Sequence, residues 1–117
     1  MTYELLITND PWQVFTIDAV IDEESIHAQF EFRYLPAPNQ WVLSLWDHAS
    51  GELLVNMIPI ICSYDIVNDL FAPFRYLRQG KGVGALMCMR GMDEVSTTDP
   101  AKGNLTEFRI IWGDING

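Results

Sequence analysis

The segment Trp41–Ile61, WVLSLWDHASGELLVNMIPII, decides the fold, because it holds two apolar stretches separated by a polar turn from Asp47 to Glu52. Alternate residues of the first stretch form two mostly apolar faces: Trp41, Leu43 and Leu45 on one, and Val42, Ser44 and Trp46 on the other. A strand that is apolar on both faces is usually buried on both. This hairpin is therefore predicted to lie at the centre of a small β domain.

The segment that precedes this hairpin, Ile26–Tyr34, has the clearest alternation in the chain. Its apolar positions are Ile26, Ala28, Phe30, Phe32 and Tyr34, and its polar positions are His27, Gln29, Glu31 and Arg33. Such alternation is typical of a strand with one face on a core and the other in water. Near the C-terminus, Leu105–Trp112 is predicted as a strand with Phe108, Ile110 and Trp112 on one face.

Shorter strands are predicted at Tyr3–Ile7, Trp12–Asp18 and Ala85–Met89, with turn residues between them. The total of about seven short strands indicates an all-β fold, either a small antiparallel barrel or a sandwich. Ser63–Gln79 fits either a short helical turn near 65–71 or an irregular loop packed by its aromatic residues. With 117 residues, the chain is expected to form one domain over 1–117.

The net charge limits the classes of molecule that the chain is expected to bind. The formal net charge is −9, and an acidic surface repels phosphate, so neither a sequence-specific nucleic acid nor a membrane surface is an expected partner. Cys62 and Cys88 lie in apolar surroundings and are predicted as buried free thiols. The N-terminus lacks the pattern of a signal peptide, so synthesis and folding in a cytoplasm are expected.

The sequence contains no recognisable catalytic or metal-binding motif. His27 and His48 have no ligand partners at metal-site spacing and are predicted to face solvent. The glycines of Gly80–Gly84 do not have the spacing of a phosphate-binding loop, so a bend or a close approach of another backbone is predicted there. We therefore expect no enzyme activity, no cofactor and no metal. An enzyme that uses two carboxylates remains an open alternative.

Several segments, taken in order, resemble the phage baseplate plug family of contractile-tailed bacteriophages. Gln13–Ile17 is similar to the opening strand of that family, and Ile26–Tyr34 to its second strand. The most recognisable segment is Trp41–Asp47, followed by a turn glycine, Gly51, and an apolar strand. The remaining matches are Asp69-Leu70, Gly84-Ala85-Leu86, and Asn104-Leu105 with a strand that ends in Trp112.

The resemblance covers Gln13 to Asp114, whereas Leu35–Gln40 and Ser63–Gln79 depart from the family pattern. It implies a structural virion protein in the hub of the tail baseplate, near the end of the tail tube. The implied partners are other hub proteins, the spike and the tail-tube proteins, with a homo-oligomer as an open alternative. It also implies synthesis in the cytoplasm of a bacterial host.

If the chain acts through protein contacts, three places are candidate interfaces. They are the second face of the hairpin strand, the stiff proline loop, and the polar loop 91–104, represented by Val42 and Trp46, Pro36 and Pro38, and Asp93 and Glu94. The alternative function is a carbohydrate- or small-ligand-binding β module with Trp46 as a stacking platform. Trp41 and Trp112 share faces with aliphatic residues and are predicted to be core.

Overall fold

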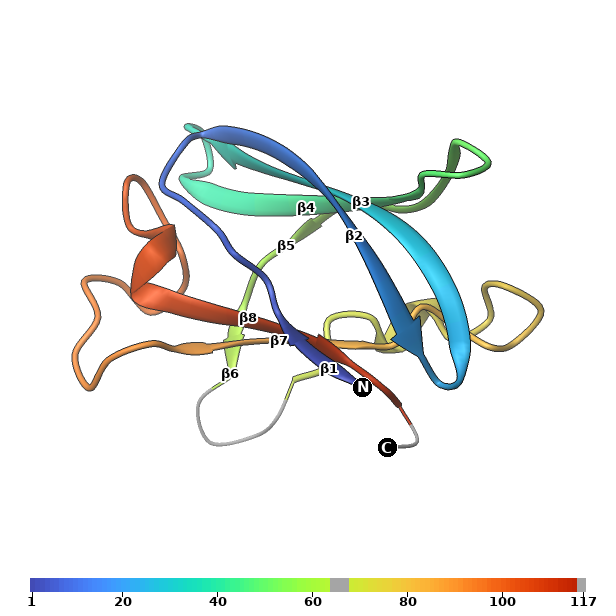
Figure 1. The fold of residues 1–117 in the computed structure, drawn as a ribbon. Coiled ribbons are helices and arrows are strands. Elements are labelled where there is room, and N and C mark those ends of the chain that lie inside the picture. Colours follow the sequence, from blue (N-terminus) through green and yellow to red (C-terminus); the bar gives the residue numbers. More distant parts are fainter. Residues whose placement is uncertain (64–67, 116–117) are drawn as a thin grey trace.

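Two four-stranded sheets face each other in a computed structural model that describes residues 1–63 and 68–115 (Figure 1). One sheet has the order β2-β3-β4-β5, with bounds Trp12–Ile21, Glu24–Leu35, Gln40–Asp47 and Glu52–Pro59. The other has the order β1-β8-β7-β6, with bounds Thr2–Glu4, Phe108–Gly113, Ala85–Arg90 and Cys62–Ser63. The fold is thus the sandwich rather than the closed barrel, and the all-β prediction is confirmed.

The sheet β2-β3-β4-β5 is an antiparallel meander, in which each strand pairs with the next one along the chain. Its first turn has only two residues, Asp22 and Glu23, with φ of +49° and +69°. Positive φ at both central residues gives a turn whose twist matches that of the flanking strands. Asp22 also accepts hydrogen bonds from the backbone of Ile115, so this turn is attached to the C-terminal end of β8.

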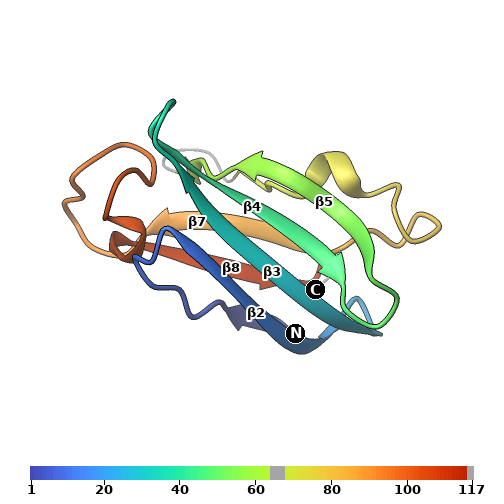
Figure 2. The same cartoon turned by 90° about the horizontal axis from the view of Figure 1, so that it is seen from above.

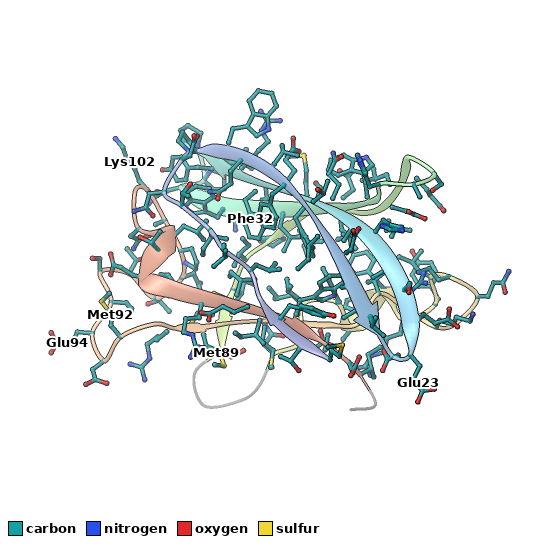
Figure 3. All side chains as sticks on the ribbon, in the orientation of Figure 1. Glu23, Phe32, Met89, Met92, Glu94 and Lys102 are labelled. Carbon is teal, nitrogen blue, oxygen red and sulfur yellow. The ribbon has the colours of Figure 1, made fainter. Side chains whose placement is uncertain are left out.

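The core lies between the sheets, where Figure 3 places Phe32. Four of the five apolar residues predicted on one face of β3 are buried, since Ile26, Ala28, Phe30 and Phe32 are at most 4% exposed, and the fifth, Tyr34, is half-buried. Trp112 of β8 meets the ring of Phe30 edge-on, with ring centroids 5.1 Å apart. Burial of large rings from both sheets supplies the apolar area that holds the layers together. The core positions predicted for Trp41 and Trp112 are confirmed.

The apolar run after β5 takes the chain from one sheet to the other. β5 ends at Pro59, Ile60 is 1% exposed, and Cys62 begins β6 in the second sheet. β6 pairs with β7 in parallel. This two-residue strand is the eighth in the described part of the chain, and the prediction of about seven strands did not include it. A bend that lets a strand switch sheets is a common way to close the corner of a sandwich.

The segment Ser63–Gln79, predicted to hold either a helical turn near 65–71 or an irregular loop, has its described helical turn just after those bounds. Residues 65–67 of the predicted turn lie outside the described residues, and a 3₁₀ turn, η1, follows at Ala72–Phe74. Asp69 organises this region: its Oδ1 accepts the backbone N–H of Phe71 and of Leu86, both at 2.9 Å. Phe71 is fully buried. A second 3₁₀ turn, η2 at Leu105–Glu107, begins the segment that was predicted entirely as strand.

The glycine-rich stretch is the predicted close approach of two backbones. Gly84 has φ +84°, and a Cβ added there would lie 2.6 Å from the carbonyl oxygen of Gly113 and 2.8 Å from Ile21. Gly84 precedes β7, and Gly113 ends the neighbouring strand β8. Only glycine lets the chain turn left-handed and approach this closely.

Candidate protein interface

The outer face of β2-β3-β4-β5 carries most of the large exposed apolar side chains on the sheets. Register places Trp12, Arg33, Val42 and Pro59 side by side in one row across the four strands. A second row contains Thr16, Gln29, Trp46 and Leu53. Exposed apolar residues on this face are Trp12 (62%), Val14 (50%) and Leu53 (44%). Each row also contains a polar side chain of β3, Arg33 in the first and Gln29 in the second, so the face is amphipathic.

Trp12 is the most exposed tryptophan, and its surroundings fix its ring. The indole N–H donates to Oε2 of Glu31 at 2.7 Å. The guanidinium of Arg33 lies over the ring, 5.4 Å from its centroid. Cross-strand neighbours on β3 therefore hold the indole on the outside of the sheet. The resulting Trp–Arg pair combines the two residue types that most often dominate protein interfaces.

The two candidate residues on β4 both lie on this outer face. Trp46 is half-buried, whereas Val42 is only 5% exposed and could reach a partner only if its neighbours moved. The strand is buried on both faces, as its sequence predicted. Ser44, the polar residue between them, is satisfied because its hydroxyl accepts the N–H of Met57 at 2.9 Å.

The other four candidates lie in two loops at one end of the sandwich. Pro36 and Pro38 are exposed in the turn between β3 and β4, and Asp93 and Glu94 are exposed in the loop after β7. Figure 3 shows Glu94 at the same end as Lys102, opposite the end that holds Glu23. Hydrogen bonds hold these two loops together, so the structure gathers these four candidates at one end. Participation of all six candidates in an interface stays a prediction.

Two contacts connect the proline turn to the loop 91–104. Oδ1 of Asn39 accepts the backbone N–H of Lys102 at 3.1 Å and the hydroxyl of Tyr34 at 2.5 Å. The buried indole N–H of Trp41 donates to the carbonyl of Ala101 at 2.7 Å. Beside these contacts is an open pocket of about 280 Å³ lined by Asn9, Pro11, Tyr34, Trp41, Lys102 and Gly103.

Sequence reasoning missed two exposed residues, Trp12 and Leu6, which is 88% exposed. The sequence held a signal for the exposure of Leu6, because alternation within the predicted strand Tyr3–Ile7 places Leu6 on the side opposite Leu5 and Ile7. Trp12 shares its face with Val14, and both were left unassigned. Exposure at Trp12 arises because β2 is the outermost strand of its sheet, which only the strand order reveals.

Both histidines are exposed, as predicted. His27 Nδ1 lies 2.5 Å from Oδ1 of Asp18, and His48 Nδ1 lies 3.0 Å from Oε1 of Gln29. In the part of the chain that the structure describes, no three His, Cys, Asp or Glu side chains are grouped so as to hold a metal ion. Across residues 1–63 and 68–115, no helix has the length and apolar character needed to cross a membrane.

The two cysteines are buried thiols outside any disulfide, as predicted, and lie side by side in the parallel β6–β7 pair. Burial raises the pKa of the Cys88 thiol well above its ordinary value, and the adjacent Cys62 raises it further.

Because the thiolate is the reactive species, we expect iodoacetamide at pH 8 to alkylate both thiols at least about 100-fold more slowly in the native than in the unfolded protein. Mass spectrometry of the labelled chain measures this ratio, and rapid native labelling would contradict the burial.

Comparison with protein families decides the class of protein. The family described as the cyanophage baseplate Pam3 plug gp18 matches residues 2–115 of this chain. The chain belongs to this family. No curated protein matches the plug sequence. The match confirms the resemblance to baseplate plugs and covers nearly the whole chain. Membership identifies a structural protein of the phage tail baseplate.

Proposed function

We propose that this plug protein lies in the baseplate hub, near the distal end of the tail tube, and acts through contacts with other hub, spike and tube proteins rather than through catalysis. Family membership over residues 2–115 is the observation that carries the proposal. The exposed outer face of β2-β3-β4-β5 supports it by offering a surface suited to a protein partner.

The apolar part of that face is larger than a solitary surface residue would explain. Trp12, Val14 and Leu53 are each at least 44% exposed, and Met57 at the rim is 41% exposed. Apolar side chains that gather on one face and are interrupted by polar groups are typical of protein interfaces. The half-buried Trp46 lies between Gln29 and Leu53 in the second row and adds an aromatic residue to the interior of the face.

The geometry favours protein contact over sugar stacking. A sugar-binding tryptophan offers a free ring face to the ligand. The ring of Trp12 instead has the Arg33 guanidinium over it and its N–H donated to Glu31. Trp46, the platform of the alternative function, is half-buried in a sheet face rather than in a cleft.

Electron microscopy of purified tails that carry a bulky tag on this protein tests the location. The expected result is extra density at the distal tip of the tail tube. Tails without extra density, in a preparation where the tag is otherwise functional, would overturn the proposed location.

We expect Trp12→Ala to lower incorporation into tails at least about 30-fold, since an aromatic hot-spot residue contributes about 2 kcal/mol or more to an interface. Quantitative mass spectrometry of purified tails measures incorporation. Tyr76→Ala is the matched control, because Tyr76 is 71% exposed on the segment before β7 and outside the proposed face. Equal incorporation of both variants would remove the outer face from the interface.

A further inference from the structure

The two edges of the sheet β2-β3-β4-β5 differ in how they are protected, and Figure 2 shows them on opposite sides of the molecule. The register of β5 against β4 shifts twice, Met57 has φ +46°, and the strand ends in Pro59. Bulges and prolines are features that keep an edge from pairing with another chain. β2 has none of them: it pairs with β3 over ten consecutive residues without a shift, and it contains neither proline nor lysine.

Three residues in the middle of β2 have outward-pointing backbone N–H and C=O groups without a hydrogen-bond partner in the part of the chain that the structure describes. The N–H of Trp12 and the N–H of Val20 point away from β3, because they donate to Asp10 and to the hydroxyl of Tyr3. Backbone groups of every second residue point the same way in an antiparallel strand, so those of Val14, Thr16 and Asp18 also point outward. Among the described residues, none forms a hydrogen bond with these three backbone units. All three residues are exposed.

This arrangement has the symmetry of a twofold interface. Thr16 is the midpoint of the stretch whose outward backbone groups have no partner among the described residues. The hydrogen-bonded N–H groups of Trp12 and Val20 bound this stretch and are equally far from Thr16 along the strand. Antiparallel pairing of β2 with itself about Thr16 sets Thr16 opposite Thr16 and Val14 opposite Asp18 of the copy. Each of these three pairs exchanges two backbone hydrogen bonds, so every free group finds a partner.

Side chains fit the same register on both faces. On the inner face, Phe15 comes opposite Ile17 of the copy, and both side chains are half-buried at the open margin of the core. On the outer face, Trp12 comes opposite Val20, which is 39% exposed. Asp18 lies across from Val14, so the two Asp18 carboxylates do not face each other.

We propose that two copies of this chain associate by antiparallel β2–β2 pairing about Thr16, which joins their sheets into one continuous sheet. This inference goes beyond the proposed function and concerns the protein in solution. Each copy has a net charge of −9, which opposes association. The dimer is therefore weak at low ionic strength and tightens as salt screens the repulsion.

Cysteine crosslinking tests the register directly. Residues in a hydrogen-bonded antiparallel pair have Cα atoms about 5.5 Å apart, which suits a disulfide. We expect oxidised Thr16→Cys protein to form a covalent dimer at least about 10-fold faster than Val14→Cys or Asp18→Cys, whose own copies lie about 14 Å apart. An equimolar mixture of the Val14→Cys and Asp18→Cys proteins should crosslink about half as fast as Thr16→Cys, because about half of its dimers pair one variant with the other. The native Cys62 and Cys88 are buried and do not compete.

Sedimentation velocity provides the second measurement. Thr16→Lys places two ammonium groups opposite each other on the twofold axis and should weaken the dimer at least about 10-fold. Ala49→Lys adds the same charge in the exposed β4–β5 turn and should not weaken it. A wild-type chain that stays monomeric at all concentrations and salts, or equal crosslinking of all three single-cysteine variants, would overturn the proposal. Neither result depends on tails, so the tag experiment on the baseplate location stands or fails separately.

Discussion

Gly84→Ala is expected to lower the free energy of unfolding by about 3 kcal/mol or more, a large part of the total stability of a small domain. Two costs add at this position. The left-handed backbone, with φ +84°, disfavours any residue with a Cβ. The added methyl would also lie 2.6 Å from the carbonyl oxygen of Gly113 and 3.0 Å from the indole nitrogen of Trp112, so β7 and β8 would have to separate.

Gly80→Ala separates the two costs. Gly80 has nearly the same backbone angle, φ +86°, but an added Cβ would meet no atom within 4 Å. It should therefore lose only about 1 kcal/mol, the cost of the left-handed conformation alone. Urea denaturation followed by circular dichroism measures both variants, with an unchanged m-value as the sign of an intact native state. Equal losses for the two variants would show that the close approach at Gly84 is relieved without cost.

That close approach shows how far the sequence could be interpreted. The spacing of the glycines argued against a phosphate-binding loop and predicted either a bend or a place where another backbone comes close. It could not predict that this backbone is Gly113, because the contact joins residues 29 positions apart. A local sequence pattern predicts the conformation and the surroundings that a residue requires. The packing of the whole sandwich determines which strand comes to lie beside it.

The faces of a strand were predictable where one face is exposed to solvent and the other is buried in the core. The alternation in β3 and in Phe108–Trp112 matches the observed burial, since period-two patterning directly reflects the two faces of a strand. The faces of β5 could not be predicted in this way. Its two register shifts break the alternation, and the backbone of Met57 is satisfied by the hydroxyl of Ser44 rather than by a regular ladder. The parallel β6–β7 pair could not be predicted either, because a strand of two residues, such as β6, is too short to show an alternating pattern.

The candidate interface was located only in part. Trp46 was preferred because its strand neighbours include a serine, yet the structure shows Trp12 more exposed. The difference comes from strand order: Trp46 has a neighbouring strand on each side, whereas Trp12 lies on an edge strand. Residue patterns within a strand cannot distinguish an edge from a centre, except through features such as prolines and bulges. β2 lacks these features, and the twofold pairing proposed above depends on their absence.

Trp112→Ala is the second substitution expected to have a large effect, a loss of about 3–5 kcal/mol. The indole is fully buried between the sheets and contacts Phe30 edge-on, with the Tyr3 ring 6.1 Å away. Truncation leaves a cavity at the point where β8, β3 and β1 meet, so the loss includes contacts of both layers. The variant should sit close to its unfolding transition at 25 °C in buffer.

Trp112→Phe distinguishes the hydrogen bond from the packing. The indole N–H donates to the buried carbonyl of Val83 at 2.7 Å, and phenylalanine leaves that oxygen without its donor. An unsatisfied buried carbonyl costs about 1–3 kcal/mol, so the Phe variant should be intermediate. Trp12→Phe, at a position 62% exposed, should change the free energy of unfolding by less than about 0.5 kcal/mol. If Trp112→Phe is as stable as wild type, the bond to Val83 contributes nothing, and the tryptophan at this position serves packing alone.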